Sequence, residues 1–231
     1  MRYFSYACLF LSALALLQEV WSRRSQSGHP LIALIQDRFD WDGAEAGFGA
    51  LAGLVSVFGA MLAAVAMGWA RLGLNPQWTA AALGLGLANV LAIFAWAAME
   101  ELIFRGAVLP QLQRWLPWPL ALTISAVIFM GAHMTSYSFS ATLAAVWLLD
   151  GLGFGIVYLG TRSLVASTLW HACKNLAVWV TGGFVFQFVP GVLRFAAFGH
   201  AEHVRYFDIL FSTAMTIGAL ALVRKRLRYV V

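Results

Sequence analysis

Apolar positions along this chain gather into long runs, and the charged residues fall mainly between them. Each run is long enough to cross a lipid bilayer as a helix. The pattern predicts about seven spans, over residues 3–21, 46–70, 79–104, 118–136, 141–160, 163–186 and 206–223. Because only helices and closed barrels satisfy their backbone polar groups inside a bilayer, we expect an all-α fold: a polytopic transmembrane helical bundle of about seven to eight helices with an intramembrane polar cavity.

Local patterns refine this organisation without dividing it, so residues 1–231 are expected to form a single integral membrane domain. Residues 30–39, inside the longest polar connection, predict a short interfacial helix. Gly151, Gly153 and Gly155 have the spacing of a nucleotide-binding motif, but no predicted strand precedes them, which favours close helix–helix packing. The first run has only Arg2 as a positive leader and no small-x-small cleavage site, which favours a retained helix over a signal peptide.

Composition supports a membrane protein and argues against other classes. The chain is 61% hydrophobic and 11% charged, with a mean hydropathy of +0.79, whereas soluble domains are about 25% charged. Its net charge of +5 is carried by residues that flank the spans, without a basic patch interleaved with stacking aromatics. We therefore expect membrane lipid and no nucleic acid among the partners. Cys8 and Cys173 lie in apolar runs and predict neither a disulfide framework nor a CxxC metal site.

The basic residues also predict the orientation of the chain. A dense cluster ends it, at Arg224, Lys225, Arg226 and Arg228, and such clusters stay cytoplasmic. Counting back over seven spans, most of the other arginines fall on the same side, which puts the N-terminus outside. The compact length favours a bacterial source, so we expect a protein of the bacterial inner membrane.

The third predicted span contains two adjacent carboxylates, Glu100 and Glu101. A carboxylate at membrane depth is costly unless it is paired or hydrated. Glu101 and Arg105 are four residues apart, so they share a helix face and can form an ion pair. Glu100 is rotated by about 100° and can face a cavity. The doublet therefore predicts a structural role for Glu101 and a role as a base for Glu100.

Two later spans add histidines and an amide. His133 lies at the end of one, and His171 and Asn175, four residues apart, project together from another. An imidazole and an amide side by side can donate to a developing oxyanion. These groups are the means to hydrolyse an amide without a covalent intermediate. Cys173 is a less suitable nucleophile because it points about 160–200° away from His171 on a helix.

Three motifs occur in order in this region: Glu-Glu-x-x-x-Arg at 100–105, Phe-x-x-x-His at 129–133 and His-x-x-x-Asn at 171–175. Together they resemble the CAAX protease and bacteriocin-processing family of glutamic-type intramembrane endopeptidases, which are related to the eukaryotic Ras-converting CAAX endopeptidase. The resemblance covers about residues 97–180, which would form the catalytic core.

The resemblance implies a role for each motif residue. Glu100 and His133 would position and deprotonate the attacking water, and His171 and Asn175 would stabilise the oxyanion. Glu101 and Arg105 would support the site through polar contacts. The family was long described as metalloproteases, and Glu100, His133 and His171 could bind zinc with an open position. Because the chain lacks a His-Glu-x-x-His motif, we expect catalysis without a cofactor and keep zinc as the alternative.

Four other charged residues in or near the spans have simpler interpretations. Lys174 lies three residues after His171, and we interpret it as a lysine that snorkels at a helix end, with contact to a substrate carboxylate as the alternative. Asp150 either pairs with a neighbouring helix or lines the cavity. Glu19 and Asp208 lie near span ends, where a charge costs little.

The main hypothesis is an intramembrane endopeptidase that cleaves a membrane-associated, C-terminal or lipidated peptide near the cytoplasmic boundary. Bacteriocin leaders, peptide pheromones and C-terminal sorting signals are candidate substrates. One alternative is an immunity or scaffolding protein of the same family without proteolysis. Another is a proton-coupled transporter, because intramembrane Glu, His and Arg also build proton relays. The lack of an inverted repeat and of broken helices argues against the transporter.

Overall fold

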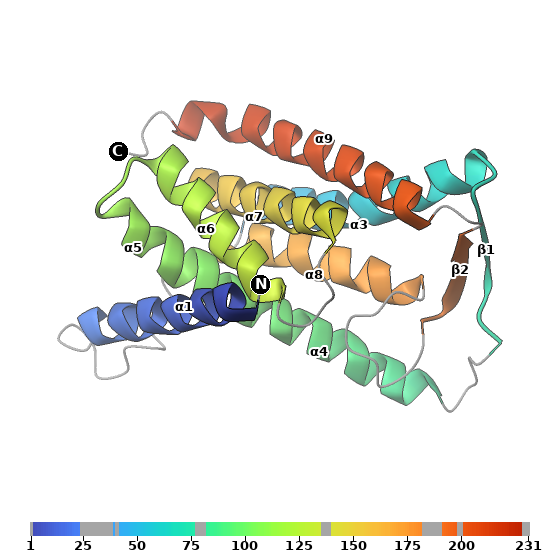
Figure 1. Cartoon of the computed structure of the whole chain (residues 1–231), viewed down its shortest axis with the longest axis horizontal. Helices are drawn as coiled ribbons and strands as arrows, with labels where there is room; N and C mark the ends of the chain where they lie inside the picture. Colours follow the sequence, from blue (N-terminus) through green and yellow to red (C-terminus); the bar gives the residue numbers. More distant parts are fainter. Residues whose placement is uncertain are drawn as a thin grey trace.

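Helices make up most of the computed structural model, which describes residues 2–23, 39, 42–76, 82–134, 140–181, 191–197 and 201–227 (Figure 1). The elements are α1 (Arg2–Arg23), α3 (Gly43–Ala66), β1 (Ala70–Leu74), α4 (Ala82–Ile103), the π-helix η1 (Phe104–Val108), α5 (Leu109–Gln113), α6 (Trp118–His133), α7 (Ala141–Thr161), α8 (Leu164–Val180), β2 (Leu193–Ala197) and α9 (Ala201–Leu227). Since α4, η1 and α5 are continuous, the described chain has seven helices, one at each predicted span.

Four of these helices are long and apolar enough to cross a membrane: Gly43–Ala66, Gly84–Gln113, Ala141–Thr161 and Tyr206–Arg224. The apolar stretches Tyr6–Ser22 and Trp118–His133 are shorter, and α8 has 17 residues. The chain is therefore an integral membrane protein. The expected seven complete spans are only partly matched, because α6, α8 and the apolar stretch of α1 are each shorter than these four helices.

Helix boundaries follow local capping chemistry. The Asp42 side chain accepts hydrogen bonds from the backbone N–H groups of Ala44 and Glu45 at the start of α3, as an N-cap residue should. Ser140 and Ser163 cap α7 and α8 in the same way. Between them, Arg162 adopts a left-handed backbone with φ of 62°. That turn ends α7 and lets α8 run back beside it.

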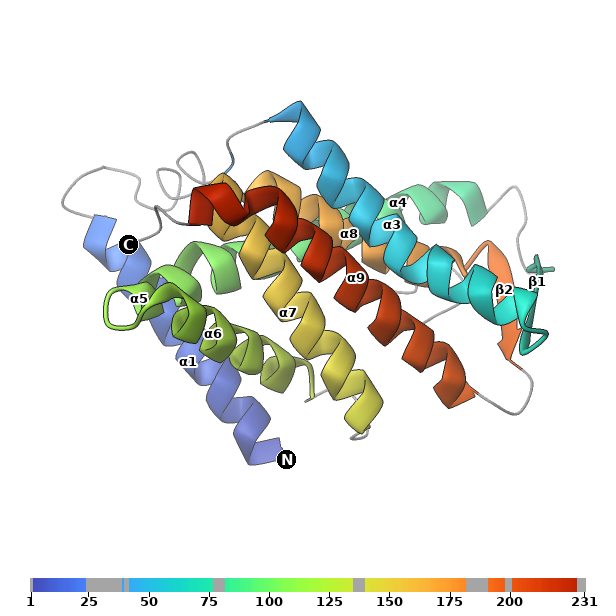
Figure 2. The ribbon, with the colours of Figure 1, turned by 90° about the horizontal axis from the view of Figure 1, so that it is seen from above.

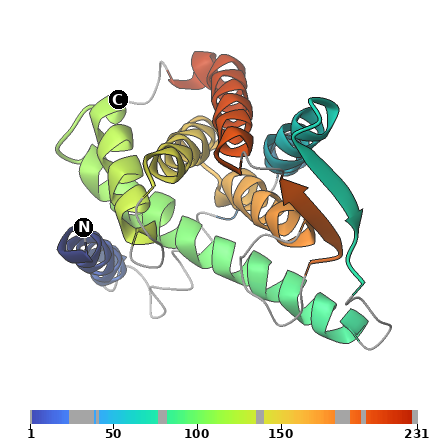
Figure 3. The same ribbon diagram turned by 45° about the vertical axis from the view of Figure 1, so that its right-hand side comes forward.

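Helix α8 occupies the middle of the bundle, in contact with α3, α4 and α7 (Figure 3). Seen from above, α9 lies beside α7 and α3, and α1 lies along α6 (Figure 2). The predicted close packing at the α7 glycines is confirmed. A Cβ at Gly151 would lie 3.0 Å from Ala126 on α6, and one at Gly153 would lie 3.0 Å from the Trp170 ring.

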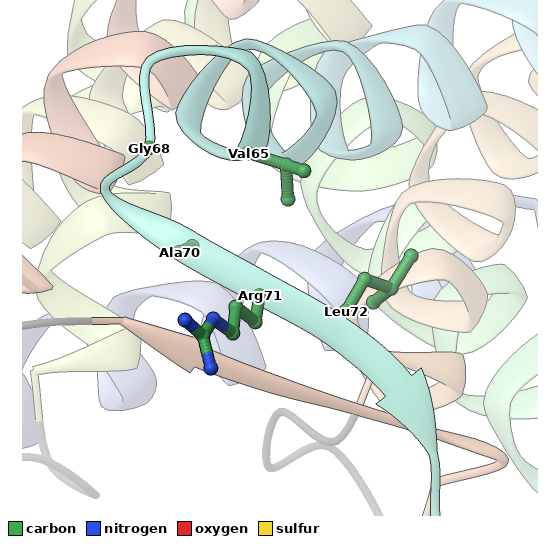
Figure 4. Close-up of a pocket in the computed structure, with 5 residues that line it drawn as sticks. All are labelled: Val65, Gly68, Ala70, Arg71 and Leu72. Carbon is green, nitrogen blue, oxygen red and sulfur yellow. The ribbon is translucent and has the colours of Figure 1, made fainter.

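The sequence patterns did not predict the antiparallel ribbon of β1 and β2, in which Ala70 pairs with Ala197 and Leu74 with Leu193. It lies at one end of the bundle (Figure 1). The strands are only five residues long and have a glycine at Gly73, so their sequence resembles a loop between spans. An open pocket lies where α3 meets β1, lined by Val65, Gly68, Ala70, Arg71 and Leu72 (Figure 4).

The predicted interfacial helix at 30–39 lies outside the described residues except for Phe39. The last residue of the basic cluster, Arg228, also lies outside them.

Candidate active site

The Glu100 carboxylate lies between two imidazole rings that come from two other helices. Its Oε2 atom is 3.4 Å from His133 Nε2 and 3.6 Å from His171 Nε2. The three residues lie on α4, α6 and α8, so the tertiary fold brings together groups that the sequence separates. Only 13% of the Glu100 side chain is exposed. The Oε1 atom accepts a hydrogen bond from Trp96 Nε1, one turn earlier on α4.

Glu101 faces the other way and is fully buried. Its Oε1 accepts a hydrogen bond from Arg105 Nη1 at 2.8 Å, which confirms the predicted ion pair. The same oxygen lies 3.0 Å from His171 Nδ1, a contact that the i, i+4 spacing could not predict. A carboxylate beside Nδ1 accepts a hydrogen from that nitrogen. Glu101 therefore orients the ring so that Nε2 faces Glu100.

Arg105 is buried, with 1% of its side chain exposed. Its Nη2 donates to the carbonyl oxygen of Gly151 on α7 at 3.0 Å. The guanidinium carbon lies 4.6 Å from the centre of the Phe129 ring and 5.1 Å from that of Phe154, within the range of cation–π attraction. A buried arginine with these partners joins the α4 end of the site to α7.

Arg105 belongs to the π-helix η1, in which the Leu109 N–H bonds to the Phe104 carbonyl, five residues earlier. Pro110 follows immediately and has no N–H to continue the α-helical pattern, and its ring would press on the carbonyl four residues before it. A wider turn relieves that conflict. Such π-turns inside α-helices frequently occur at functional sites.

The two histidines are held in place by backbone and aromatic contacts. His133 Nδ1 lies 2.9 Å from the Phe129 carbonyl oxygen, which fixes the Nδ1 hydrogen and points Nε2 at Glu100. The His133 ring packs on Phe129 at 4.3 Å and on Trp147 at 5.4 Å between ring centres. His171 stacks on Phe154, with centres 4.9 Å apart and planes 18° apart.

These contacts leave three acceptor or donor atoms directed at one point: Glu100 Oε2 and the two Nε2 atoms. Among the residues that the structure describes, Glu100 Oε2 has no hydrogen-bond partner. It is therefore available to accept a proton. With Nδ1 already donating, a neutral ring presents a lone pair at Nε2, and a doubly protonated ring presents an N–H.

Asn175 lies one turn after His171 on α8 and is half-buried. No hydrogen bond within the described part of the chain joins it to the other five predicted residues. The structure thus connects Glu100, Glu101, Arg105, His133 and His171 in one network. It leaves Asn175 beside that network on the same helix face.

The expected zinc alternative has suitable donors, because Glu100, His133 and His171 are ligand types that zinc takes. Both rings are oriented from Nδ1 by a carbonyl or a carboxylate, as metal-binding histidines are. No group of three His, Cys, Asp or Glu side chains within the described ranges has the spacing of a metal site. Loading a zinc ion would require these three side chains to adjust around it.

The expectations for Lys174 and Glu19 were wrong, and the structure decides between the two alternatives for Asp150. Lys174 is buried and does not snorkel: its Nζ donates to Asp150 Oδ1, Asp208 Oδ1 and Ser212 Oγ. Of the two alternatives for Asp150, pairing with a neighbouring helix is confirmed. Glu19 is also buried and accepts a hydrogen bond from Gln111 Nε2 at 2.9 Å. Neighbouring helices cover these charges. Their position along a predicted span could not show this.

Several contributors carried no signal in the sequence. Trp96, Trp147 and Phe154 look like any apolar residue of a span, and the Gly151 carbonyl has no side-chain signature. The pocket at the α3–β1 junction is lined by none of the predicted site residues.

The family model for type II CAAX prenyl endopeptidases, Rce1-like, matches residues 82–177. No curated protein and no solved structure matches the chain. The matched residues run from the start of α4 into α8 and include all six predicted site residues, whereas α1, α3, the ribbon and α9 lie outside them.

Proposed function

Through residues 82–177 the chain belongs to the Rce1-like family of type II CAAX prenyl endopeptidases, and we propose that it is an intramembrane endopeptidase. Its substrate would be a membrane-associated, C-terminal or lipidated peptide. The observation that supports this proposal best is the approach of Glu100 Oε2 to His133 Nε2 and His171 Nε2, at 3.4 and 3.6 Å.

In the first step, Glu100 acts as a general base on a water that His133 helps to orient. Glu100 Oε2 takes a proton from the water, and the hydroxide oxygen forms a bond to the carbonyl carbon of the substrate. The carbonyl becomes a tetrahedral oxyanion. Since Glu100 and His133 lie on different helices, the relative position of α4 and α6 sets the geometry of attack.

The oxyanion is stabilised by donors on α8. His171 Nε2–H and the Asn175 side-chain N–H would point at the developing charge. Because His171 Nδ1 already donates to Glu101, donation from Nε2 requires hydrogens on both ring nitrogens. Glu101 and Arg105 contribute by holding the ring, with Oε1 of Glu101 shared between Arg105 Nη1 and His171 Nδ1.

The intermediate collapses when Glu100 returns its proton to the amide nitrogen of the leaving group. The C–N bond breaks, a carboxylic acid and an amine are formed, and Glu100 is again ionised. The acid then loses its proton to the amine or to water. The cycle needs no covalent enzyme intermediate. If zinc were bound by Glu100, His133 and His171, it would act as a Lewis acid for the water.

We further propose that the N-terminus is outside and the C-terminus cytoplasmic, in a bacterial inner membrane. The basic residues at the end of α9, Arg224 and Lys225, support this orientation. In that arrangement the site would receive peptides whose cleavage point lies near the cytoplasmic boundary.

The proposal is tested with the purified full chain in lipid nanodiscs and a set of fluorogenic C-terminal peptides, with and without a lipid group. Glu100→Gln should lower cleavage by at least about a hundredfold with an unchanged unfolding temperature. Glu45→Gln, at the start of α3, is the control and should cleave as wild type does. Wild-type rates in a folded Glu100→Gln protein would refute the assignment. A wild-type protein that binds these peptides without cleaving them would favour the scaffolding alternative.

A further inference from the structure

A buried cluster of charges lies where α8 meets α7 and α9, and it is not used in the proposed reaction. Lys174 Nζ donates to Asp150 Oδ1 on α7 at 2.8 Å, to Asp208 Oδ1 on α9 at 3.1 Å and to Ser212 Oγ on α9 at 2.9 Å. All three ammonium hydrogens therefore have acceptors. Lys174 and Asp150 are nearly inaccessible, with side-chain exposures of 6% and 8%. This group of four residues is called the Lys174 cluster below.

The Lys174 cluster is connected to the site along two helices, α8 and α7. On α8, Lys174 lies three residues after His171 and one before Asn175. On α7, Asp150 precedes Gly151, whose carbonyl oxygen accepts a hydrogen bond from Arg105. A displacement of α8 or α7 at the cluster would therefore move residues of the site.

Another side of α8 is held by close packing against α3. A Cβ at Gly49 would lie 2.1 Å from the Ala166 carbonyl oxygen, and one at Gly53 would lie 2.3 Å from that of Trp170. Only glycines allow the two backbones to approach this closely. Cys173 packs at the same contact, because a Cβ at Gly53 would also lie 2.9 Å from the Cys173 Cβ. Helix α8 is thus confined between α3 on one side and α7 and α9 on the other.

The charges favour one rotation of α8 about its own axis. Steric packing fixes the distance between α8 and α3, and the charges add a constraint that depends on direction. A rotation of α8 would carry the ammonium away from two buried carboxylates, and unpaired charges in a low-dielectric interior are strongly disfavoured. Ser212 Oγ lies within 3.4 Å of Asp150 Oδ1 and 3.3 Å of Asp208 Oδ1, so it couples the two carboxylates.

We propose that Lys174, Asp150, Asp208 and Ser212 form a positioning clamp that fixes the rotation of α8 and thereby the placement of His171 and Asn175. Helix α9 lies outside the matched residues 82–177, yet through Asp208 and Ser212 it becomes part of the functional unit. The inference rests on the proposed endopeptidase function for its catalytic consequence. Its structural content, the fixed rotation of α8, does not depend on that function.

The catalytic test uses variants that do not strand a buried charge. Ser212→Ala removes one acceptor, and Asp208→Asn removes the charge of the most exposed member, whose side chain is 25% exposed. Both should lower kcat by about ten- to a hundredfold with KM nearly unchanged, because a small misplacement of reacting groups is enough to slow the chemical step. Lys174→Arg keeps the charge and should retain more activity than the neutral variant Asp150→Asn/Lys174→Met/Asp208→Asn. Thr213→Ala, on the neighbouring position of α9, is the matched control.

The structural test follows the rotation of α8 without using cleavage. In a Cys8→Ser background, Cys173 is the one remaining thiol, since the chain has two cysteines, and it is buried against α3. Ser212→Ala and Asp208→Asn should raise the rate of Cys173 alkylation by N-ethylmaleimide severalfold, and Thr213→Ala should not. Because Lys174→Met leaves two carboxylates without their cation, the neutral variant Asp150→Asn/Lys174→Met/Asp208→Asn is measured beside it. It should fold and show the same increase.

The outcomes separate the clamp from the proposed function. If folded Ser212→Ala and Asp208→Asn proteins keep the wild-type alkylation rate, or keep the wild-type kcat in an active enzyme, the clamp is refuted. If the wild type cleaves no peptide but the alkylation rates change as expected, the clamp stands and the endopeptidase assignment fails. Glu100→Gln should abolish cleavage and leave alkylation of Cys173 unchanged.

Discussion

Glu101 and His171 are joined across α4 and α8 by a contact of 3.0 Å between Oε1 and Nδ1. The same oxygen binds Arg105, so a single carboxylate atom connects the arginine of the first motif to the histidine of the third. This relationship explains why two adjacent glutamates occur at membrane depth. One holds the histidine in position, and the other faces the free nitrogen of the same ring.

Glu101→Gln should therefore destabilise the protein and also lower kcat. It leaves the Arg105 guanidinium, with 1% of its side chain exposed, without an opposing charge on its closest partner. Removing one partner of a buried pair costs about 3–5 kcal/mol. The measurement is the unfolding temperature in detergent, together with kcat in nanodiscs.

Glu19→Gln provides the comparison for this prediction. Glu19 is nearly as buried, but its cationic partner Arg114 has 46% of its side chain exposed and can be solvated when the pair is broken. The loss of stability should be smaller, within about 1 kcal/mol as for a partly exposed pair. Equal losses in the two variants would contradict the explanation from burial.

His133→Gln should lower kcat by about 10²–10⁴-fold, the range for losing a group that assists proton transfer. Trp96→Phe removes the indole N–H that bonds to the other oxygen of Glu100, together with part of a partly exposed ring, so it should have a smaller effect. Peptide cleavage at saturating substrate distinguishes the two. A Trp96→Phe defect as large as that of His133→Gln would mean that holding Glu100 in place matters more than the imidazole.

Asn175→Ala tests the oxyanion assignment, which rests on the position of Asn175 one turn after His171 on α8. The loss of one oxyanion donor should lower kcat by about 10²–10³-fold, and KM should change little because the interaction forms mainly in the transition state. Asn75→Ala is the control, since Asn75 Nδ2 donates to the Gly191 carbonyl oxygen, outside the site. A rise in KM alone would instead assign Asn175 to substrate binding.

The order of the helices and the pairing of Glu101 with Arg105 could be predicted from sequence, because both depend on local periodicity. Apolar runs longer than a bilayer leave few alternatives to helices, and i, i+4 spacing fixes neighbours on one helix. The separation of the two glutamates onto different faces followed from the same geometry.

Contacts between helices could not be predicted in this way. Which acceptor His171 Nδ1 meets depends on how α8 rotates against α4, and no periodicity reports that rotation. Lys174 shows the same limit. Its interpretation as a lysine that snorkels at a helix end is wrong, because α7 and α9 cover it. The β1–β2 ribbon was missed because two five-residue strands form only by pairing with each other across more than a hundred residues.

Chelation tests the choice between metal-free and zinc-dependent catalysis. If Glu100 and His133 act directly on water, the cleavage rate should persist after prolonged dialysis against a strong chelator. Added zinc should not raise the rate. A protein inactivated by chelation and restored by stoichiometric zinc would instead assign Glu100, His133 and His171 as ligands. Measured zinc content, with Glu45→Gln as the control protein, separates a bound metal from inhibition by the chelator.

Two glycines on α3 give a sharp test of how the packing of α8 supports the site. A Cβ at Gly49 would lie 2.1 Å from the Ala166 carbonyl oxygen, whereas one at Gly47 would meet nothing within 4 Å. Because a backbone oxygen cannot move aside alone, Gly49→Ala should push α8 from α3, at a cost of about 1–3 kcal/mol. His171 would move with α8, so kcat should fall together with the unfolding temperature.

Gly47→Ala should change the stability in the opposite direction. The added methyl group would lie in open space on the same helix, and alanine stabilises a helix interior over glycine by about 0.5–1 kcal/mol. The unfolding temperature should therefore stay level or rise, with wild-type kcat. If both substitutions lower stability alike, general intolerance of α3 to side chains accounts for the result. If only Gly49→Ala does so and kcat falls with it, the separation between α3 and α8 is what keeps His171 at Glu100.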